Sequence, residues 1–377
     1  MAEPGIRGRC PPRFAAVRAA FEANFAEGRE LGARFAFAIE GEVVVDLMGG
    51  WADRDHAVPF GETTLTPIFS TTKAVAALLI ARLVDEGCLS YGQRVAEVWP
   101  EFSQAAKGEI TVEQMMSHQA GLCGLRGPMD PADWFDWDLI CSRLAAMEPL
   151  WPPGTASGYH PVTFGYLAGE VFRRIDGRTM GVALREDIAG PLDLDVWIGL
   201  PDSEHDRVAD VRRPSALPKL GPLTEPRRLA FLTKWASPGG DKSAADWRRE
   251  EIPSANGHAT APALAQLMGA LASDGALGVA RVLSPGVAAE AARRRIVGED
   301  LVLPYRMAWG AGFIRNEGLG IYGPGPETFG HSGWGGSCAF ADPERGVSGA
   351  YVMNRQSAEL IADSRARRLI EAAYEGL

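Results

Sequence analysis

The 377-residue chain is 46% hydrophobic and 23% charged, a composition that is typical of a soluble globular protein. Its net charge of -10 argues against nucleic acid or an anionic membrane surface as the main partner. Because 377 residues exceed one ordinary hydrophobic core, the length predicts two domains or one domain with a large insertion.

The cysteines and the opening residues bear on the cellular compartment. The five cysteines are scattered and form no Cys-x-x-Cys pair, which favours reduced thiols over a disulfide framework or a zinc site. The opening residues MAEPGIRGRCPPRF contain no apolar stretch, and no run of about 18 apolar residues occurs, so we expect no membrane segment and no membrane partner. A cytoplasmic protein is the simplest interpretation.

Elements at the two ends of the chain mirror each other. A helix is predicted after two prolines, with the apolar stripe Phe14, Val17, Phe21 and Phe25. Residues 33–48 then read as two strands around Glu40-Gly41, which predicts a hairpin. Residues 337–354 repeat this pattern around a turn at 342–346, and a last helix is predicted over about 357–375. We therefore predict one antiparallel sheet that is assembled from both termini and covered by helices.

The middle of the chain is predicted to be an insertion in this α+β fold. The sheet domain takes residues 1–75 and 276–377, and a mostly helical domain takes residues 76–275. Helical patterns with caps recur in the insertion, at 110–122, 162–175 and 262–275. From about 200 to 256 the composition shifts to Pro, Arg, Asp and Ser with little periodicity, which predicts a long irregular excursion that helps to shape a binding pocket.

The stretch 67–87, PIFSTTKAVAALLIARLVDEG, holds a candidate nucleophile and base. Ala74 to Val84 is almost entirely apolar, which predicts a helix buried on nearly all sides. Lys73 lies at its start, three residues after Ser70 and on the same face. A buried lysine has a lowered pKa and can accept a proton from a neighbouring hydroxyl. In the alternative interpretation, Ser70 only caps the helix and Lys73 extends to the surface.

Two further stretches carry polar chemistry. Tyr159 lies in a Gly- and Pro-rich turn before a helix, where it can project into a cleft and relay a proton, or simply mark a domain boundary. Residues 328–340, TFGHSGWGGSCAF, are rich in glycine and lead into a strand, so backbone can approach a ligand closely there. The Trp334 N–H, together with that of Ser70, can then hold an oxyanion.

The order of these motifs resembles the serine β-lactamase and penicillin-binding-protein superfamily. Within it, the chain resembles most the family VIII carboxylesterases, which are similar to class C β-lactamases. The resemblance covers nearly the whole chain, is weakest from about 200 to 250, and includes ITVEQMMSHQAGL, WPPGTASGYHPVTFGYLAGEVFRRIDGR, IPSANGHATA and GHSGWGGSCAFADPERG. It implies the β-lactamase-like α+β fold and a site that uses no metal and no cofactor.

The resemblance also implies a role for each matching residue. Ser70 is expected to be the acylated nucleophile, with Lys73 as its proton acceptor and Tyr159 sharing the base function. Which of the last two is the acylation base stays open. The N–H groups of Ser70 and Trp334 are expected to form the oxyanion hole. The expected substrate-binding residues lie at and after the place of the family's Lys-Thr-Gly: His331, Ser332, Gly333, Gly335 and Gly336.

Two departures from the class C pattern favour an esterase. Pro161 stands where class C β-lactamases have Asn, and His331 stands where they have the lysine that pairs with a penicillin carboxylate. An anionic β-lactam would use both contacts, whereas a neutral ester needs neither. We therefore predict a carboxylesterase that cleaves small-molecule esters, and the resemblance to the family implies short to medium acyl chains. Weak β-lactam hydrolysis and acyl transfer by the same site remain alternatives, and the sequence does not predict the oligomeric state.

Other classes of protein fit less well. An α/β-hydrolase would show Gly-x-Ser-x-Gly, which is absent. A metal hydrolase would cluster its histidines, yet the six present form neither H-x-x-x-H nor H-E-x-x-H, and His118 is expected to be structural. A non-catalytic homologue would lose Ser70, Lys73 or Tyr159, and all three are present.

Overall fold

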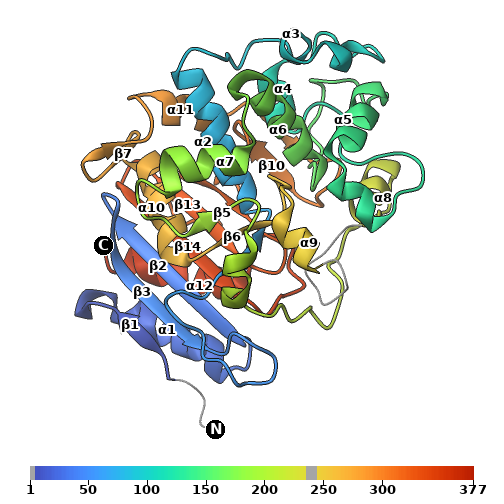
Figure 1. The fold of residues 1–377 in the computed structure, drawn as a ribbon. Helices are drawn as coiled ribbons and strands as arrows, with labels where there is room; N and C mark the ends of the chain where they lie inside the picture. Colours follow the sequence, from blue (N-terminus) through green and yellow to red (C-terminus); the bar gives the residue numbers. More distant parts are fainter. Residues whose placement is uncertain (1–4, 235–243) are drawn as a thin grey trace.

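The computed structural model describes residues 5–234 and 244–377, and its main sheet is built from both ends of the chain (Figure 1). Within these residues the sheet has nine strands, in the order β1 (Arg7–Arg9), β3 (Glu42–Gly50), β2 (Gly32–Ile39), β14 (Val347–Met353), β13 (Cys338–Asp342), β12 (Phe329–Ser332), β11 (Ile314–Arg315), β10 (Arg306–Trp309) and β9 (Ile296–Glu299). Because β14 pairs antiparallel with β2, strands from the two termini lie side by side. The predicted antiparallel sheet is confirmed.

Both predicted hairpins are present. Glu40 and Gly41 join β2 to β3 with φ values of 50° and 78°, and two successive left-handed residues form the turn that matches the right-handed twist of paired strands. Gly346, with φ 63°, closes the turn between β13 and β14. Two smaller sheets are made of β4 (Thr66–Phe69), β6 (Gly257–Ala259) and β5 (Val196–Trp197), and of β7 (Ala276–Leu277) and β8 (Ala280–Arg281).

Helices cover both faces of the main sheet. Along β2, Phe35 and Phe37 point into the core formed with α1 (Ala15–Ala26) and α12 (Ser364–Glu375), whereas Ala36 points into the opposite core. On that opposite face α10 (Ala261–Ala272) lies close to the strands, and Ser348 Oγ donates to the Ala265 carbonyl oxygen at 2.7 Å. Small residues on this face allow the close approach of the helix.

The remaining helices gather beyond the sheet, with α3 to α6 at the top of Figure 1. They are α2 (Thr72–Asp85), α3 (Val95–Val98), α4 (Val112–Met116), α5 (Trp137–Ala146), α6 (Thr163–Asp176), α7 (Met180–Leu184), α8 (Glu225–Phe231), α9 (Ala244–Arg249) and α11 (Val287–Ala292). The division of the chain into domains at residues 75 and 276 stays a prediction. Helix α10 belongs by its residue numbers to the predicted helical domain, 76–275, but it packs on the main sheet.

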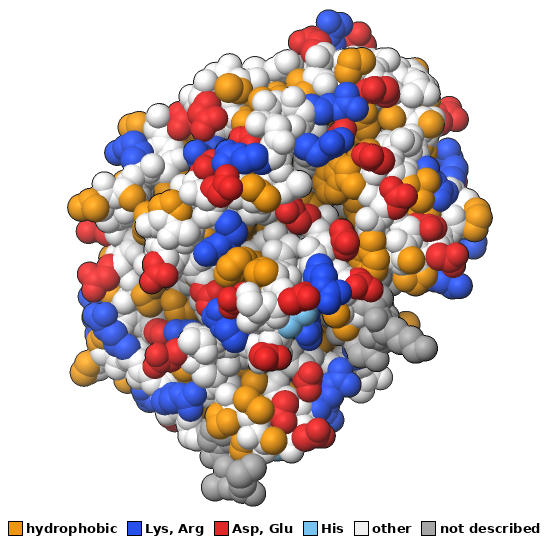
Figure 2. All heavy atoms as spheres, in the orientation of Figure 1, with side chains coloured by type: hydrophobic (Ala, Val, Ile, Leu, Met, Phe, Trp, Pro, Cys, Tyr) orange, Lys and Arg blue, Asp and Glu red, His pale blue; other side chains and the backbone are white. Residues whose placement is uncertain are grey.

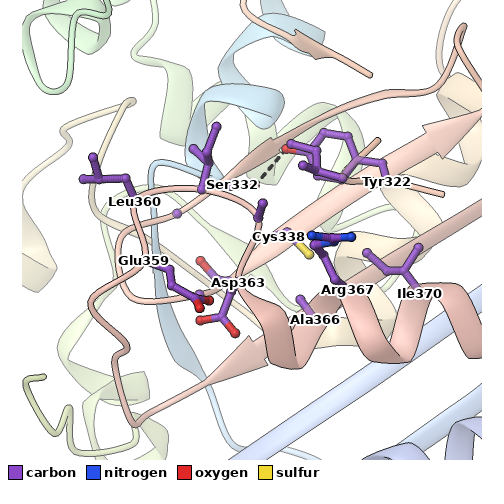
Figure 3. Close-up of a pocket in the computed structure, with 15 residues that line it drawn as sticks. Tyr322, Ser332, Cys338, Glu359, Leu360, Asp363, Ala366, Arg367 and Ile370 are labelled. Carbon is purple, nitrogen blue, oxygen red and sulfur yellow. Dashed lines mark hydrogen bonds between the residues drawn. The ribbon is translucent and has the colours of Figure 1, made fainter. Parts of the chain in front are cut away.

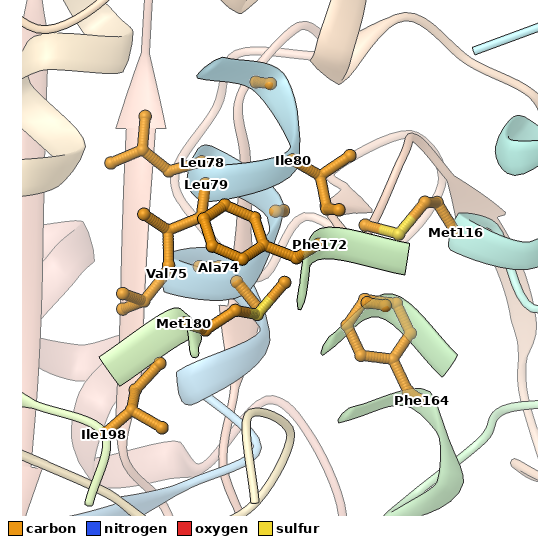
Figure 4. Close-up of a cluster of buried hydrophobic side chains, with 14 of the residues drawn as sticks. Ala74, Val75, Leu78, Leu79, Ile80, Met116, Phe164, Phe172, Met180 and Ile198 are labelled. Atoms are coloured by element: carbon orange, nitrogen blue, oxygen red, sulfur yellow. The ribbon is translucent and has the colours of Figure 1, made fainter. Parts of the chain in front are cut away.

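Helix α2 lies at the centre of the packing, as its sequence predicts. It contacts α6, α7, α11 and β12, and every residue from Thr72 to Ala81 is buried. Figure 4 shows Val75, Leu78 and Leu79 packed among side chains of other elements, including Phe172 and Met180. A polar side chain within residues 72–81 of this helix is therefore shielded from solvent.

Two predicted helix boundaries are wrong for tertiary reasons. The helix predicted over 110–122 ends at Met116, because His118 adopts a left-handed conformation with φ 64°. The last helix begins at Ser364 rather than about 357, because the Asp363 side chain caps it by accepting from the Arg365 N–H. The excursion at 200–256 contains the short helices α8 and α9, and its residues 235–243 lie outside the described part of the chain.

Neither the charged side chains of the surface nor the five cysteines gather at one place. On the face in Figure 2, acidic and basic side chains are interspersed. No helix of the described residues is long and apolar enough to span a membrane. All five cysteines are unpaired thiols: Cys10, Cys88, Cys123, Cys141 and Cys338.

Candidate active site

Ser70 lies at the junction between β4 and α2. Phe69, the last residue of the strand, has φ 48°, which turns the chain sharply before the helix. Ser70 is half-buried, and its carbonyl oxygen accepts from the Lys73 N–H at 3.0 Å. This first turn brings Lys73 Nζ to 3.2 Å from Ser70 Oγ.

Lys73 is completely buried, so the alternative in which it extends to the surface is wrong. Its Nζ donates to the carbonyl oxygens of Pro161, at 2.6 Å, and Ser254, at 2.9 Å. The ring centres of Tyr159 and Phe164 lie 4.8 and 5.7 Å from Nζ. Burial in these surroundings lowers the pKa of Lys73 well below its ordinary value, because the charged form loses its hydration.

The two carbonyl contacts constrain how a neutral Lys73 can bond. A carbonyl oxygen only accepts, so each of these contacts uses one N–H. A neutral amine has two N–H groups and one lone pair, and the lone pair is then left for Ser70. The contacts of Lys73 therefore allow its neutral amine to accept the Ser70 hydroxyl proton.

Tyr159 approaches the same hydroxyl from the loop before α6. Burial raises the pKa of the Tyr159 phenol and the negative charge of Asp300 adds to this, while the neighbouring Ser70 hydroxyl acts in the opposite direction. The Tyr159 ring stacks on Trp309, with ring centres 5.8 Å apart and planes 3° apart. The phenol is therefore uncharged at neutral pH and held by an aromatic neighbour.

Three histidines lie around Tyr159 and Lys73, and each is buried. Burial lowers the pKa of His160 to about 3 and those of His118 and His331 well below their ordinary value. His331 Nδ1 donates to the Ser332 carbonyl oxygen at 2.8 Å, and its Nε2 has no partner among the described residues. The His331 imidazole thus places a neutral ring, not a cation, 6.0 Å from the ring centre of Tyr159.

The glycine-rich segment after β12 lies directly against the Ser70 turn. A Cβ atom on Gly333 would come within 2.3 Å of the Ile68 carbonyl oxygen, so only glycine fits there. Ser337 Oγ donates to the same carbonyl at 2.7 Å. Among the described residues, neither the Ser70 N–H nor the Trp334 N–H has a hydrogen-bond acceptor. Two backbone donors are thus free on adjacent segments, as an oxyanion hole needs.

A small cavity lies behind this segment (Figure 3). Its lining includes Ser332, Cys338 and Leu360, and Tyr322 OH lies 2.9 Å from Ser332 Oγ at its edge. Its free volume of about 10 Å³ holds one water molecule at most. It is too small to bind an acyl chain, and the Ser332 hydroxyl is already paired with Tyr322.

Some residues of this cluster are predicted from the sequence and others are not. Ser70, Lys73, Tyr159 and His331 come together as expected. The residues that were missed act through backbone atoms or from distant loops: the carbonyl groups of Pro161 and Ser254, and the side chains of His160, Asp300 and Trp309. Pro161 lacks the asparagine side chain of class C β-lactamases, but its carbonyl oxygen accepts from Lys73, and a backbone carbonyl leaves no signature in the sequence.

The family model described as Beta-lactamase matches residues 17–374. The chain belongs to the beta-lactamase family. Among curated relatives, the "Esterase/beta-lactamase LipL" of Mycobacterium tuberculosis is 37% identical over 96% of this chain and 86% of its own. The resemblance to this superfamily is confirmed.

Solved structures of beta-lactamase family members are similar along the whole chain. A family VIII carboxylesterase is 44% identical, with a TM-score of 0.93 and coverage of 99% of this chain and 100% of the other. A penicillin-binding-protein homolog from Caulobacter crescentus is 68% identical, with a TM-score of 0.97 and the same coverage. The chain is therefore a hydrolase of the serine esterase and beta-lactamase-like group, with carboxylesterase relatives. Among the described residues, no group of three or more His, Cys, Asp or Glu side chains could hold a metal ion.

Proposed function

We propose that this chain is a carboxylesterase that hydrolyses neutral esters of short to medium acyl chains through an acyl-enzyme on Ser70. The supporting observation is the contact set of Lys73, whose Nζ lies 3.2 Å from Ser70 Oγ and donates to two backbone carbonyls. This set fits a neutral amine beside a hydroxyl, which is the arrangement that activates a serine.

Acylation begins with Lys73 as the base. Ser70 Oγ attacks the ester carbonyl carbon while its proton passes to the Nζ lone pair, which leaves an oxyanion and a Lys73 ammonium. The ammonium then has three N–H groups for three acceptors, namely Ser70 Oγ and the Pro161 and Ser254 carbonyls. The raised pKa of Tyr159 argues against a resting phenolate, and so against Tyr159 as the first base.

Tyr159 acts on the leaving group. When the tetrahedral intermediate collapses, the Tyr159 phenol donates its proton to the departing alcohol oxygen and regains one from Lys73. In deacylation the same pair takes a proton from the attacking water and returns it to Ser70 Oγ. The N–H groups of Ser70 and Trp334 bind the oxyanion in both steps, and loss of one such donor typically costs about 100- to 1000-fold in rate.

The charge of the site favours a neutral substrate. His331 stands where the class C lysine would pair with a β-lactam carboxylate, and burial lowers its pKa so that the imidazole is uncharged. A neutral ring offers no ion pair to a carboxylate. We therefore place ester hydrolysis above β-lactam hydrolysis, although one relative carries both names.

The test is intact-protein mass spectrometry after a brief reaction with p-nitrophenyl acetate or butyrate. We expect an acyl adduct on Ser70, a burst of nitrophenol, and neither in the Ser70→Ala variant. A parallel nitrocefin assay measures β-lactam turnover, and added methanol measures acyl transfer through the yield of methyl ester. An adduct that forms equally in Ser70→Ala would overturn the assignment of the nucleophile.

A further inference from the structure

The buried carboxylate of Asp300 accepts hydrogen bonds both from the loop of Tyr159 and from Trp309, whose ring stacks on that of Tyr159. Asp300 follows β9 and is 4% exposed. No cation among the described residues forms an ion pair with it. Its charge is instead met by five donors: the N–H of Tyr159 at 2.9 Å, Val302 at 3.0 Å and Leu303 at 2.9 Å, Ser157 Oγ at 3.0 Å and Trp309 Nε1 at 3.2 Å.

The two oxygens of Asp300 fix different parts of the site. Oδ1 accepts from the backbone of Tyr159 and from two residues of its own loop. Oδ2 accepts from Ser157 Oγ and from the indole of Trp309, whose ring lies parallel to that of Tyr159. The backbone of Tyr159 and the surface on which its ring rests are therefore attached to the same group. We propose that Asp300 is a positioning residue, which holds the Tyr159 phenol in line with Ser70 and Lys73.

This inference rests on the proposed function, because it assumes that Tyr159 transfers a proton. A phenol displaced by about 1 Å from Ser70 would lose much of its rate while substrate binding stays the same. The negative charge of Asp300 also supports the role of Tyr159 as a proton donor. A buried carboxylate near the phenol disfavours the phenolate and so keeps the proton on Tyr159. Neither effect involves contact between Asp300 and the substrate.

The decisive variant is Asp300→Asn. Its amide oxygen can still accept from the three backbone N–H groups, so the loop is retained. Its amide nitrogen would face the Trp309 N–H, donor against donor, which releases the indole. We expect kcat to fall about 10- to 100-fold with KM within about twofold, because only proton transfer is affected. Asp342→Asn is the control for loss of a buried carboxylate: Asp342 lies at the far end of β13, where it accepts from the Glu344 N–H and pairs with Arg345.

A double-mutant cycle with Tyr159→Phe separates positioning from general damage. If Asp300 acts through Tyr159, the Asp300→Asn change costs almost nothing in the Tyr159→Phe background. An equal loss in both backgrounds, or an equal loss of kcat in Asp342→Asn, would overturn the positioning role. If Tyr159→Phe itself keeps full activity, the proposed function of Tyr159 fails instead, and the two failures remain distinct. Trp309→Phe keeps a ring without the N–H and is expected to reproduce part of the kcat loss.

Discussion

Among the lysines that the structure describes, Lys73 and Lys107 are fully buried, and their acceptors differ. Lys107 Nζ donates to three carbonyl oxygens, those of Gln104 at 2.8 Å, Ala145 at 2.9 Å and Met147 at 2.6 Å. Lys73 Nζ meets two carbonyl oxygens and, as its third neighbour, the Ser70 hydroxyl. Three carbonyls use all three N–H groups of an ammonium, whereas a hydroxyl can either accept from the amine or donate to it.

The comparison shows that burial alone does not make a lysine a base. Burial lowers the pKa of Lys107 to about 8, so at neutral pH it remains the ammonium that its three carbonyls require. Lys73 can lose its proton without leaving an acceptor unpaired, because its third contact can reverse direction. The acceptors around Lys107 thus fit a structural role, whereas those around Lys73 fit its proposed role as a proton acceptor.

The largest expected difference between the two lysines is in catalysis. Lys73→Met is expected to lower kcat/KM for a p-nitrophenyl ester about 1000- to 10000-fold, because the proposed general base is lost. Lys107→Met is expected to leave kcat/KM of the folded protein unchanged and to lower the melting temperature, because three buried carbonyls lose their donor. Activity per folded molecule and thermal unfolding are measured on both variants. Substantial turnover by the Lys73→Met variant would show that Lys73 is not part of the mechanism.

A smaller effect on kcat/KM is expected when the pH is lowered. In the proposed mechanism the base is the neutral amine of Lys73, so kcat/KM should fall by about tenfold per pH unit below the pKa of Lys73 and be level above it. Lys107→Met should keep this acid limb in place. The residual activity of Lys73→Met should lack it. A limb that persists in Lys73→Met would instead belong to another group, for which the neighbouring histidines with lowered pKa values, His118, His160 and His331, are the candidates.

The sequence predicts the placement of Ser70 beside Lys73 better than it predicts the groups that surround them. Ser70 and Lys73 share one helical turn, so their spacing alone places them together. The hairpins of β2–β3 and β13–β14 are equally local, and alternating residues with turn signals predict them. Each of these features is decided by neighbours within a few positions of the chain.

Other features, which depend on contacts between distant parts of the chain and carry no motif, could not be predicted. The carbonyl acceptors of Lys73 come from Pro161 and Ser254, and a backbone carbonyl has no residue signature. Asp300 lies 141 residues from Tyr159, in a loop with no motif. The early end of α4 has the same cause, since the left-handed His118 lies among Tyr159, His160 and Trp309 rather than continuing a helix.

The smallest expected effect is on the free energy of unfolding. Its dependence on pH reports the charge states of Lys73 and Lys107 directly. Where a lysine pKa is lower in the folded than in the unfolded chain, the unfolded chain binds more protons, so the free energy of unfolding rises with pH between the two values. For Lys107 this window runs from about 8 to 10.5, with no contribution to the slope below it. For Lys73 the window must extend below pH 7 if its amine is neutral in the resting enzyme.

Denaturant unfolding of the wild type, Lys73→Met and Lys107→Met from pH 6 to 10 measures both windows. The difference between wild type and Lys107→Met should be constant below pH 8 and change by up to about 1.4 kcal/mol per pH unit above it. The difference between wild type and Lys73→Met should already change between pH 6 and 8. A flat difference over that range would mean that Lys73 stays protonated at rest, and the first proton acceptor would then have to be sought elsewhere, with Tyr159 the remaining candidate.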